Sequence, residues 1–134
     1  MAACSDPAGP GVDWSGCDKS DMDLGEVNLS GANLTDANLS YSKLWDANLT
    51  QANLTKADLT GADLSGADLS RATLTNAGLS LAVLNFANLT HTIMSGVVLK
   101  SANLIEADLT QANLSNATWT DGRSCAEYSM ETCN

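Results

Sequence analysis

A leucine recurs every five residues over most of this sequence, and Met94 and Trp119 replace it at two of these positions. Counted from Leu24 to Trp119 in steps of five, the chain holds 20 five-residue units between Met22 and Asp121. Leu occupies 18 of the 20 central positions, and Ala occupies 15 of the 20 positions two residues earlier. Asn or Asp usually precedes the central residue, and Ser or Thr usually follows it. Any fold for this chain must therefore place every fifth side chain equivalently.

A period of five fits neither an α-helix nor a β-strand. A helix repeats every 3.6 residues and would spread the leucines over all its faces, whereas a strand would send successive leucines to opposite faces. A coil of short straight segments joined by tight turns satisfies the pattern, with each unit forming one side of a square and four units closing one coil. The leucines and alanines then point inward. Asn, Asp, Ser, Thr and Gly lie at the corners, where they favour turns.

The repeated pattern Ala-(Asn/Asp)-Leu is seen in Ala32–Leu39, which reads ANLTDANL. It resembles the repeat of the pentapeptide-repeat family, and the resemblance covers residues 22–121 without an insertion. The resemblance implies an all-β fold, a right-handed quadrilateral β-helix that forms a solenoid of five coils of four pentapeptides. At a spacing of about 4.8 Å between strands, such a rod would be roughly 24 Å long.

The two ends of the chain are expected to form irregular caps, because a bare terminal coil exposes its core and its backbone edge. Extending the repeat toward the N-terminus would put Lys19 at a central position, and burying an unpaired lysine is costly. We therefore expect an N-terminal cap over residues 1–21, a repeat domain over residues 22–121 and a C-terminal cap over residues 122–134.

All four cysteines lie in the expected caps, Cys4 and Cys17 in the first, Cys125 and Cys133 in the second. The Cα atoms of bridged cysteines lie within about 7 Å. Bridges between the ends of the rod are therefore excluded unless the tails fold back along it. The expected pairs are Cys4–Cys17 and Cys125–Cys133, and the alternative is four free thiols in a reducing compartment.

Disulfides would indicate an oxidising compartment. Exported members of the family from photosynthetic bacteria and plants carry similar cysteine-bearing ends. The resemblance therefore implies the periplasm or the thylakoid lumen, with a signal peptide already removed, rather than the cytoplasm. The chain has no long apolar run, so no membrane insertion is expected.

Several outward positions of the repeats are apolar instead of polar. Single apolar residues on a surface are common, and local repacking in the fourth coil is one interpretation of this group. Contiguous apolar surface often marks an interface. The hypothesis is an interaction patch formed by Trp45, Leu81, Val83, Phe86, Ile93, Val98 and Ile105.

The sequence offers little for catalysis. The single histidine, His91, is expected at a solvated corner, and neither cysteine pair has the Cys-x-x-Cys spacing of a metal site. An interior filled by Leu and Ala leaves no ligand cavity. We therefore expect no catalytic residue, no cofactor, no metal and no enzyme.

The charge balance bears on the partner. With 16 acidic and 6 basic residues the net charge is −10, a poor match for nucleic acid. The expected function is a non-catalytic structural or protein-interaction module that binds another protein and exists as a monomer or weak dimer.

The alternative comes from the resemblance, because some family members mimic B-form DNA and inhibit DNA gyrase. DNA carries one charge per about 1.7 Å, so a rod of roughly 24 Å would need on the order of 14 negative charges. The 100 residues of the repeat region carry 10 acidic and 4 basic residues, a net charge of −6. The DNA mimic is therefore the second hypothesis.

Overall fold

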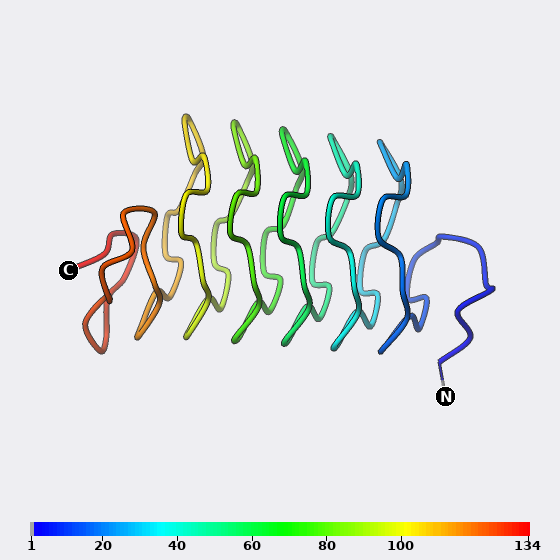
Figure 1. Cartoon of the computed structure of the whole chain (residues 1–134), viewed down its shortest axis with the longest axis horizontal. Helices are drawn as coiled ribbons and strands as arrows, with labels where there is room; N and C mark the ends of the chain where they lie inside the picture. Colours follow the sequence, from blue (N-terminus) through cyan, green and yellow to red (C-terminus); the bar gives the residue numbers. More distant parts are fainter. Residues whose placement is uncertain (1) are drawn as a thin grey trace.

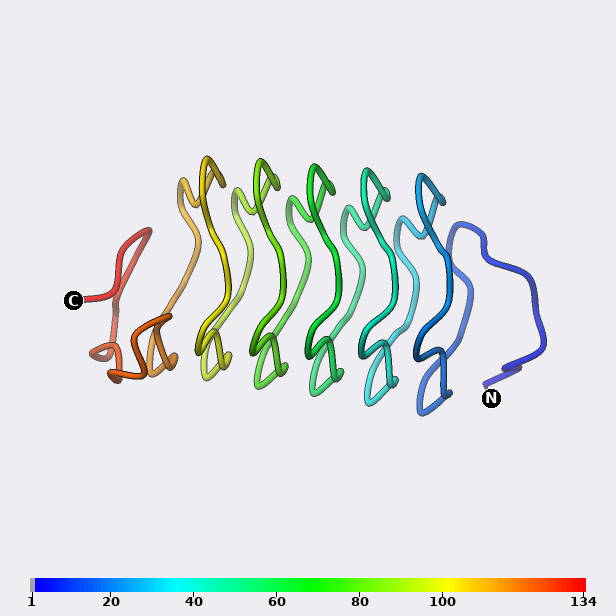
Figure 2. The same cartoon turned by 45° about the horizontal axis from the view of Figure 1, so that its top comes forward.

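The computed structural model describes residues 2–134, which contain no α-helix and no extended strand. The chain winds as a stack of similar coils along one axis, with the termini at opposite ends (Figure 1; Figure 2). Isolated parallel β-bridges join residues twenty positions apart, from Asp13↔Asn33 to Val98↔Thr118. Since the sequence unit has five residues, four units make one coil. The right hand of the winding, which the resemblance implies, stays a prediction.

The bridges define four sides of the stack, which the chain visits in the order A, B, C, D. Sides A and C therefore face away from each other, as do sides B and D. Side A carries the bridged residues Asp13, Asn33, Asn53, Thr73, Ile93 and Asn113, and side B carries Asp18, Asn38, Asp58, Gly78, Val98 and Thr118. Side C carries Asp23, Lys43, Asp63, Val83 and Asn103, and side D carries Asn28, Asn48, Asp68, Asn88 and Asp108.

The central leucines fill the interior, as the period of five predicts. Every central residue from Leu29 to Leu89 is 0% exposed. Two of the inward alanines are replaced by hydroxyl residues, and both hydroxyls are satisfied: Ser42 donates to the carbonyl of Leu39 at 2.7 Å, and Thr92 donates to that of Leu89 at 2.8 Å. A buried hydroxyl costs little when it is hydrogen-bonded, so the core tolerates both exceptions.

The polar residues of the repeat build the corners. In the unit around Leu49, the Asn48 side-chain oxygen accepts hydrogen bonds from the Thr50 N–H at 3.0 Å and from the Thr50 hydroxyl at 2.8 Å. Gln51 then adopts a positive φ of 57°, and the Ala52 N–H donates to the Leu49 carbonyl at 3.0 Å. The order Asn/Asp, Leu, Ser/Thr thus provides both the inward side chain and the turn that follows it.

Three of these corner aspartates connect stability to pH. The pKa values of Asp13, Asp18 and Asp108 lie below the ordinary value of 3.8. The main cause is a hydrogen bond from the hydroxyl of the Ser or Thr two residues later in the chain, and the second cause is a hydrogen bond from the backbone N–H of that same residue. A carboxyl group with a lowered pKa in the folded state stabilises it above the unfolded pKa, and this contribution is lost as the pH falls through the folded pKa.

We therefore expect the melting temperature to fall as the pH is lowered below 3.8. The triple variant Asp13→Asn, Asp18→Asn, Asp108→Asn keeps an acceptor oxygen at each corner but cannot titrate. Thermal melts followed by circular dichroism from roughly pH 6 down to well below the ordinary carboxyl value of 3.8 should give a shallower fall for the variant. Identical slopes for the two proteins would contradict the assignment.

The regular winding begins nearer the N-terminus than expected. Asp13 is already bridged to Asn33, and Asp18 is bridged to Asn38, in the same pattern as the later coils. The expected boundary after residue 21 is therefore wrong. The Gly11 N–H already donates to the Ser30 carbonyl at 2.8 Å, as the Gly31 N–H does to the Thr50 carbonyl at 2.9 Å one coil later.

Lys19 explains the difference, because it occupies a central position without being an unpaired buried charge. Lys19 is 8% exposed. Its Nζ donates a hydrogen bond to the Cys4 carbonyl at 2.5 Å and lies 4.1 Å from the centre of the Trp14 ring. A lysine can bury its aliphatic stem while its ammonium group finds a carbonyl and an aromatic face. The Cys4–Cys17 disulfide, with a Cα–Cα distance of 5.5 Å, holds that carbonyl over the coil.

The C-terminal residues 122–134 fold back over part of the last coil. Two antiparallel bridges, Thr118↔Ser124 and Asn113↔Met130, place this segment on sides B and A. The N–H of Leu114, which ends the core on side A, donates to the Ser129 carbonyl at 2.7 Å.

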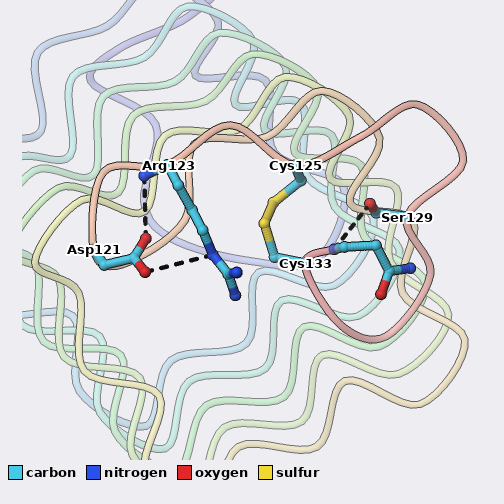
Figure 3. A network of polar contacts seen from close by, with 6 residues as sticks. Asp121, Arg123, Cys125, Ser129 and Cys133 are labelled. Carbon is cyan, nitrogen blue, oxygen red and sulfur yellow. Dashed lines mark hydrogen bonds and ion pairs between the residues drawn. A yellow bond between two sulfur atoms is a disulfide. The ribbon is translucent and has the colours of Figure 1, made fainter.

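A disulfide closes this segment. Cys125 and Cys133 are bonded, with a Cα–Cα distance of 4.8 Å, and Figure 3 shows the bond in front of the stacked coils. At the turn that enters the segment, Arg123 Nε lies 3.4 Å from a carboxylate oxygen of Asp121 (Figure 3). The pairing thus joins cysteines within each end of the rod, as expected, and none across it.

Candidate interaction surface

Four exposed apolar residues of the last two coils gather on side C and its two corners. Leu81 is 57% exposed, Phe86 is 68% exposed and Ile105 is 61% exposed, with Val83 between them at 36%. Leu81 and Phe86 occupy the corners at the two ends of side C in one coil. The Phe86 N–H donates to the Ile105 carbonyl of the next coil at 3.0 Å. We call these four residues, Leu81, Val83, Phe86 and Ile105, the side-C patch.

The other three residues of the predicted patch lie elsewhere or face differently. Ile93 is on side A, opposite Val83, and Val98 is on side B. Trp45 is on side C but is only half-exposed, and its ring lies over Gly25: a Cβ atom on Gly25 would be 2.3 Å from that ring. The seven residues therefore do not form one surface, and the side-C patch is what the fold brings together.

Tyr41 is an exposed aromatic residue that the sequence analysis missed. It is 58% exposed and occupies the same corner as Leu81, two coils nearer the N-terminus. Its ring covers Gly61 in the intervening coil, because a Cβ atom there would come within 2.4 Å of the ring. The signal was present in the sequence as an aromatic residue followed twenty positions later by glycine.

Leu81 and Phe86 hold an unfavourable backbone conformation. Their φ angles are 63° and 61°, in the left-handed region that costs a residue with a Cβ atom roughly 1–2 kcal/mol. The other corners have a positive φ as well: some carry Gly, Asn or Asp, which tolerate this conformation better, and others carry Glu, Gln, Lys or Arg. Two large apolar side chains at such corners, both pointing to solvent, add strain without filling the core.

This strain predicts that Leu81→Gly and Phe86→Gly each stabilise the fold by about 0.5–1 kcal/mol, because glycine removes the clash but adds entropy to the unfolded chain. Leu81→Ala and Phe86→Ala are the matched controls, since alanine shortens the side chain but keeps the Cβ atom. Chemical denaturation should show a higher midpoint for the glycine variants only. An equal gain with alanine would show that side-chain exposure, not backbone strain, is responsible.

Other kinds of site could involve His91, a cavity or a group of metal-binding side chains. His91 is exposed on a corner of side D, as expected. Within residues 2–134 there is no cavity and no group of three or more His, Cys, Asp or Glu side chains placed to hold a metal ion. The same residues include no helix with the length and apolar character needed to cross a membrane.

Comparisons with solved structures give several similar proteins. Rfr23, a pentapeptide repeat protein from the cyanobacterium Cyanothece 51142, is 42% identical with a TM-score of 0.56, over 72% of this chain and 63% of Rfr23. The protein alr5209 from Nostoc Pcc 7120 is 40% identical with a TM-score of 0.59, over 60% of this chain and 66% of alr5209. The chain thus spans slightly less than two thirds of each of these relatives.

A more distant likeness concerns the fold alone. QnrB1, a plasmid-mediated fluoroquinolone resistance protein, is 20% identical with a TM-score of 0.52, over 80% of this chain and 65% of QnrB1. A comparison with curated protein sequences gave no match. The family model for pentapeptide repeats matches eight copies, at residues 11–40, 32–71, 52–85 and 82–118. The chain therefore belongs to the pentapeptide-repeat family.

Proposed function

We propose that this chain is a non-catalytic interaction module, a monomer or weak dimer, that binds another protein through the side-C patch. The observation that carries the proposal is the exposure of the large apolar side chains that gather on side C, above all Leu81, Phe86 and Ile105. These side chains contribute nothing to the core, and a partner that covered them would remove their apolar surface from water. Apolar surface of this kind, surrounded by polar residues, is typical of protein interfaces.

The two disulfides support an oxidising compartment for this activity. Each holds an end of the rod, and structural disulfides of small proteins persist outside reducing compartments. We therefore place the chain in the periplasm or the thylakoid lumen, as an exported protein.

The test is a pull-down from the compartment of origin with three forms of the chain. We expect wild type to retain a protein that the Phe86→Ser, Ile105→Ser variant loses. The matched control is Ile93→Ser, Val98→Ser, which removes two exposed apolar side chains from sides A and B. Equal retention by both double variants, with unchanged melting temperatures, would sink the proposal.

DNA mimicry predicts a different result. No carboxylate occurs between Asp68 and Glu106, so nearly two coils of the rod lack the negative charge that a DNA surrogate needs. We expect the purified chain to leave the supercoiling activity of DNA gyrase unchanged at concentrations up to about ten times that of the enzyme. Inhibition in that range would favour the mimic.

A further inference from the structure

The C-terminal end of the rod is only half covered. Residues 122–134 pair with sides A and B, whereas sides C and D of the last coil, residues 102–111, have no coil beyond them. Figure 2 shows this terminal segment at one end of the stack, and Figure 3 shows its backbone in front of the coils. We call residues 102–111 the open edge.

The open edge carries unpaired backbone groups. In the preceding coil the N–H groups of Leu84, Phe86 and Leu89 donate to carbonyls of the last coil at 2.8, 3.0 and 2.8 Å. The equivalent N–H groups of Leu104, Glu106 and Leu109 make no hydrogen bond within residues 2–134.

The carbonyls on this edge are unpaired as well. Ala82 and Ala87 accept from Asn103 and Asp108 at 2.9 and 3.0 Å. The equivalent carbonyls of Ala102 and Ala107 accept none from the described part of the chain. Such an edge is a template for another strand.

The core is also incompletely covered beside this edge. Leu104 and Leu109 are half-buried, although the equivalent leucines one coil earlier, Leu84 and Leu89, are 0% exposed. A segment that pairs with the edge would therefore gain apolar contacts as well as hydrogen bonds. Ile105 and Phe86 continue the apolar surface onto side C.

The charge around the open edge is negative. Glu106 and Asp108 lie on it, and Glu131 stands at its far end, where its Oε1 accepts the Gln111 N–H at 2.9 Å. Residues 101–122 contain no Lys or Arg. A second copy of this chain would bring like charges together here, whereas a basic segment would meet opposite ones.

We propose that the open edge binds a segment of a partner protein, in which Lys or Arg separates apolar residues with the five-residue period of the coil, by strand addition. The backbone of the segment pairs with the free N–H and C=O groups, as in other cases of β-augmentation. The segment turns the corner at Glu106 as the coil does, so that its apolar side chains cover Leu104 and Leu109 while the basic ones face Glu106 and Asp108. The open edge shares Ile105 with the side-C patch, but the proposal rests on its free backbone groups and on the charges of Glu106 and Asp108, not on the patch.

The probe is a capped peptide of two Val-Lys-Val-Lys-Lys units, the Lys-Val peptide, whose valines match the inward residues Ala102, Leu104, Ala107 and Leu109. The charge control is the Glu-Val peptide, in which Glu replaces every Lys. We expect fluorescence anisotropy to show binding of the Lys-Val peptide only. Amide hydrogen exchange followed by NMR should slow at Leu104, Glu106 and Leu109 by at least about tenfold, because these N–H groups become hydrogen-bonded. A Lys-Val peptide N-methylated at every residue should not bind, because it has no N–H group left to donate on either edge.

Two double variants of the chain separate the edge from general electrostatics. Glu106→Gln, Asp108→Asn removes two charges at the edge and should weaken peptide binding roughly fivefold to tenfold. Asp63→Asn, Asp68→Asn removes two charges from the same sides in the middle of the rod and should leave affinity unchanged.

Four results would overturn the proposal: no binding by wild type, no slowing of the three amides, equal weakening by both double variants, or undiminished binding of the N-methylated peptide. Protection of the three amides that rises with the concentration of the chain alone would also overturn it, since the occupant would then be a second copy. The pull-down variant Phe86→Ser, Ile105→Ser keeps Glu106 and Asp108. Peptide binding at the open edge can therefore still be observed if the pull-down shows that the side-C patch binds no protein.

Discussion

Replacing Leu64 by Asp is expected to abolish cooperative folding. Leu64 is 0% exposed and lies in the middle of the stack, with its N–H bonded to the Val83 carbonyl at 2.7 Å. A carboxylate there would be surrounded by leucine and alanine, and an uncompensated buried charge costs several kcal/mol. Since a small domain is stable by only about 5–15 kcal/mol, one such change is enough.

The position in the stack increases the effect. Each coil of a solenoid contacts only its neighbours, so a defect in the middle separates two shorter stacks instead of fraying one end. The matched control is Leu81→Asp, which places the same charge at an exposed corner where Asp tolerates a positive φ. Circular dichroism should show a sharp thermal transition for Leu81→Asp and none for Leu64→Asp. A sharp transition in both would contradict the inward assignment of the central residues.

Loss of the two disulfides is expected to lower the melting temperature by roughly 10–20 °C. The bridges close loops with sequence separations of 13 and 8 residues, and each such loop is worth about 2–3 kcal/mol. They also hold the segments that cover the end coils. Without the Cys4–Cys17 bond, the carbonyl that accepts from Lys19 is free to leave, and the buried ammonium group loses that partner.

Melting should be measured with and without reductant, on wild type and on the variant Cys4→Ser, Cys17→Ser, Cys125→Ser, Cys133→Ser. Wild type should fall to the level of the variant when reduced, and the variant should not respond to reductant at all. A wild type that ignores reductant would favour free thiols and would remove the support for an oxidising compartment.

The repeat itself was predictable because its geometry is local. Once every fifth side chain points inward, residues twenty apart must stack, and every parallel bridge follows this rule. The cysteine pairs followed from the length of the rod. The N-terminal boundary did not, because the sequence shows Lys19 as a charge at a central position but does not show the carbonyl and the ring that satisfy it.

The interaction surface was predictable only in part. The repeat pattern identifies the apolar outer residues, but it does not show that the Trp45 ring packs over Gly25 instead of pointing to solvent. Ile93 and Val98 are close to Phe86 in the sequence but lie on other sides of the coil. Tyr41 was overlooked, although it occupies the same corner as Leu81 and belongs to the same column of residues spaced twenty apart.

The interior, the corners and the columns follow from the repeat alone, because each unit meets the same neighbours in every coil and local turn chemistry sets its shape. The extent to which residues 122–134 cover the last coil follows only from the folded chain. Residues 122–134 have no repeat to guide them, and their antiparallel return over sides A and B depends on long-range pairing and on the bond between Cys125 and Cys133. That return leaves sides C and D open, with the N–H groups of Leu104, Glu106 and Leu109 at the edge.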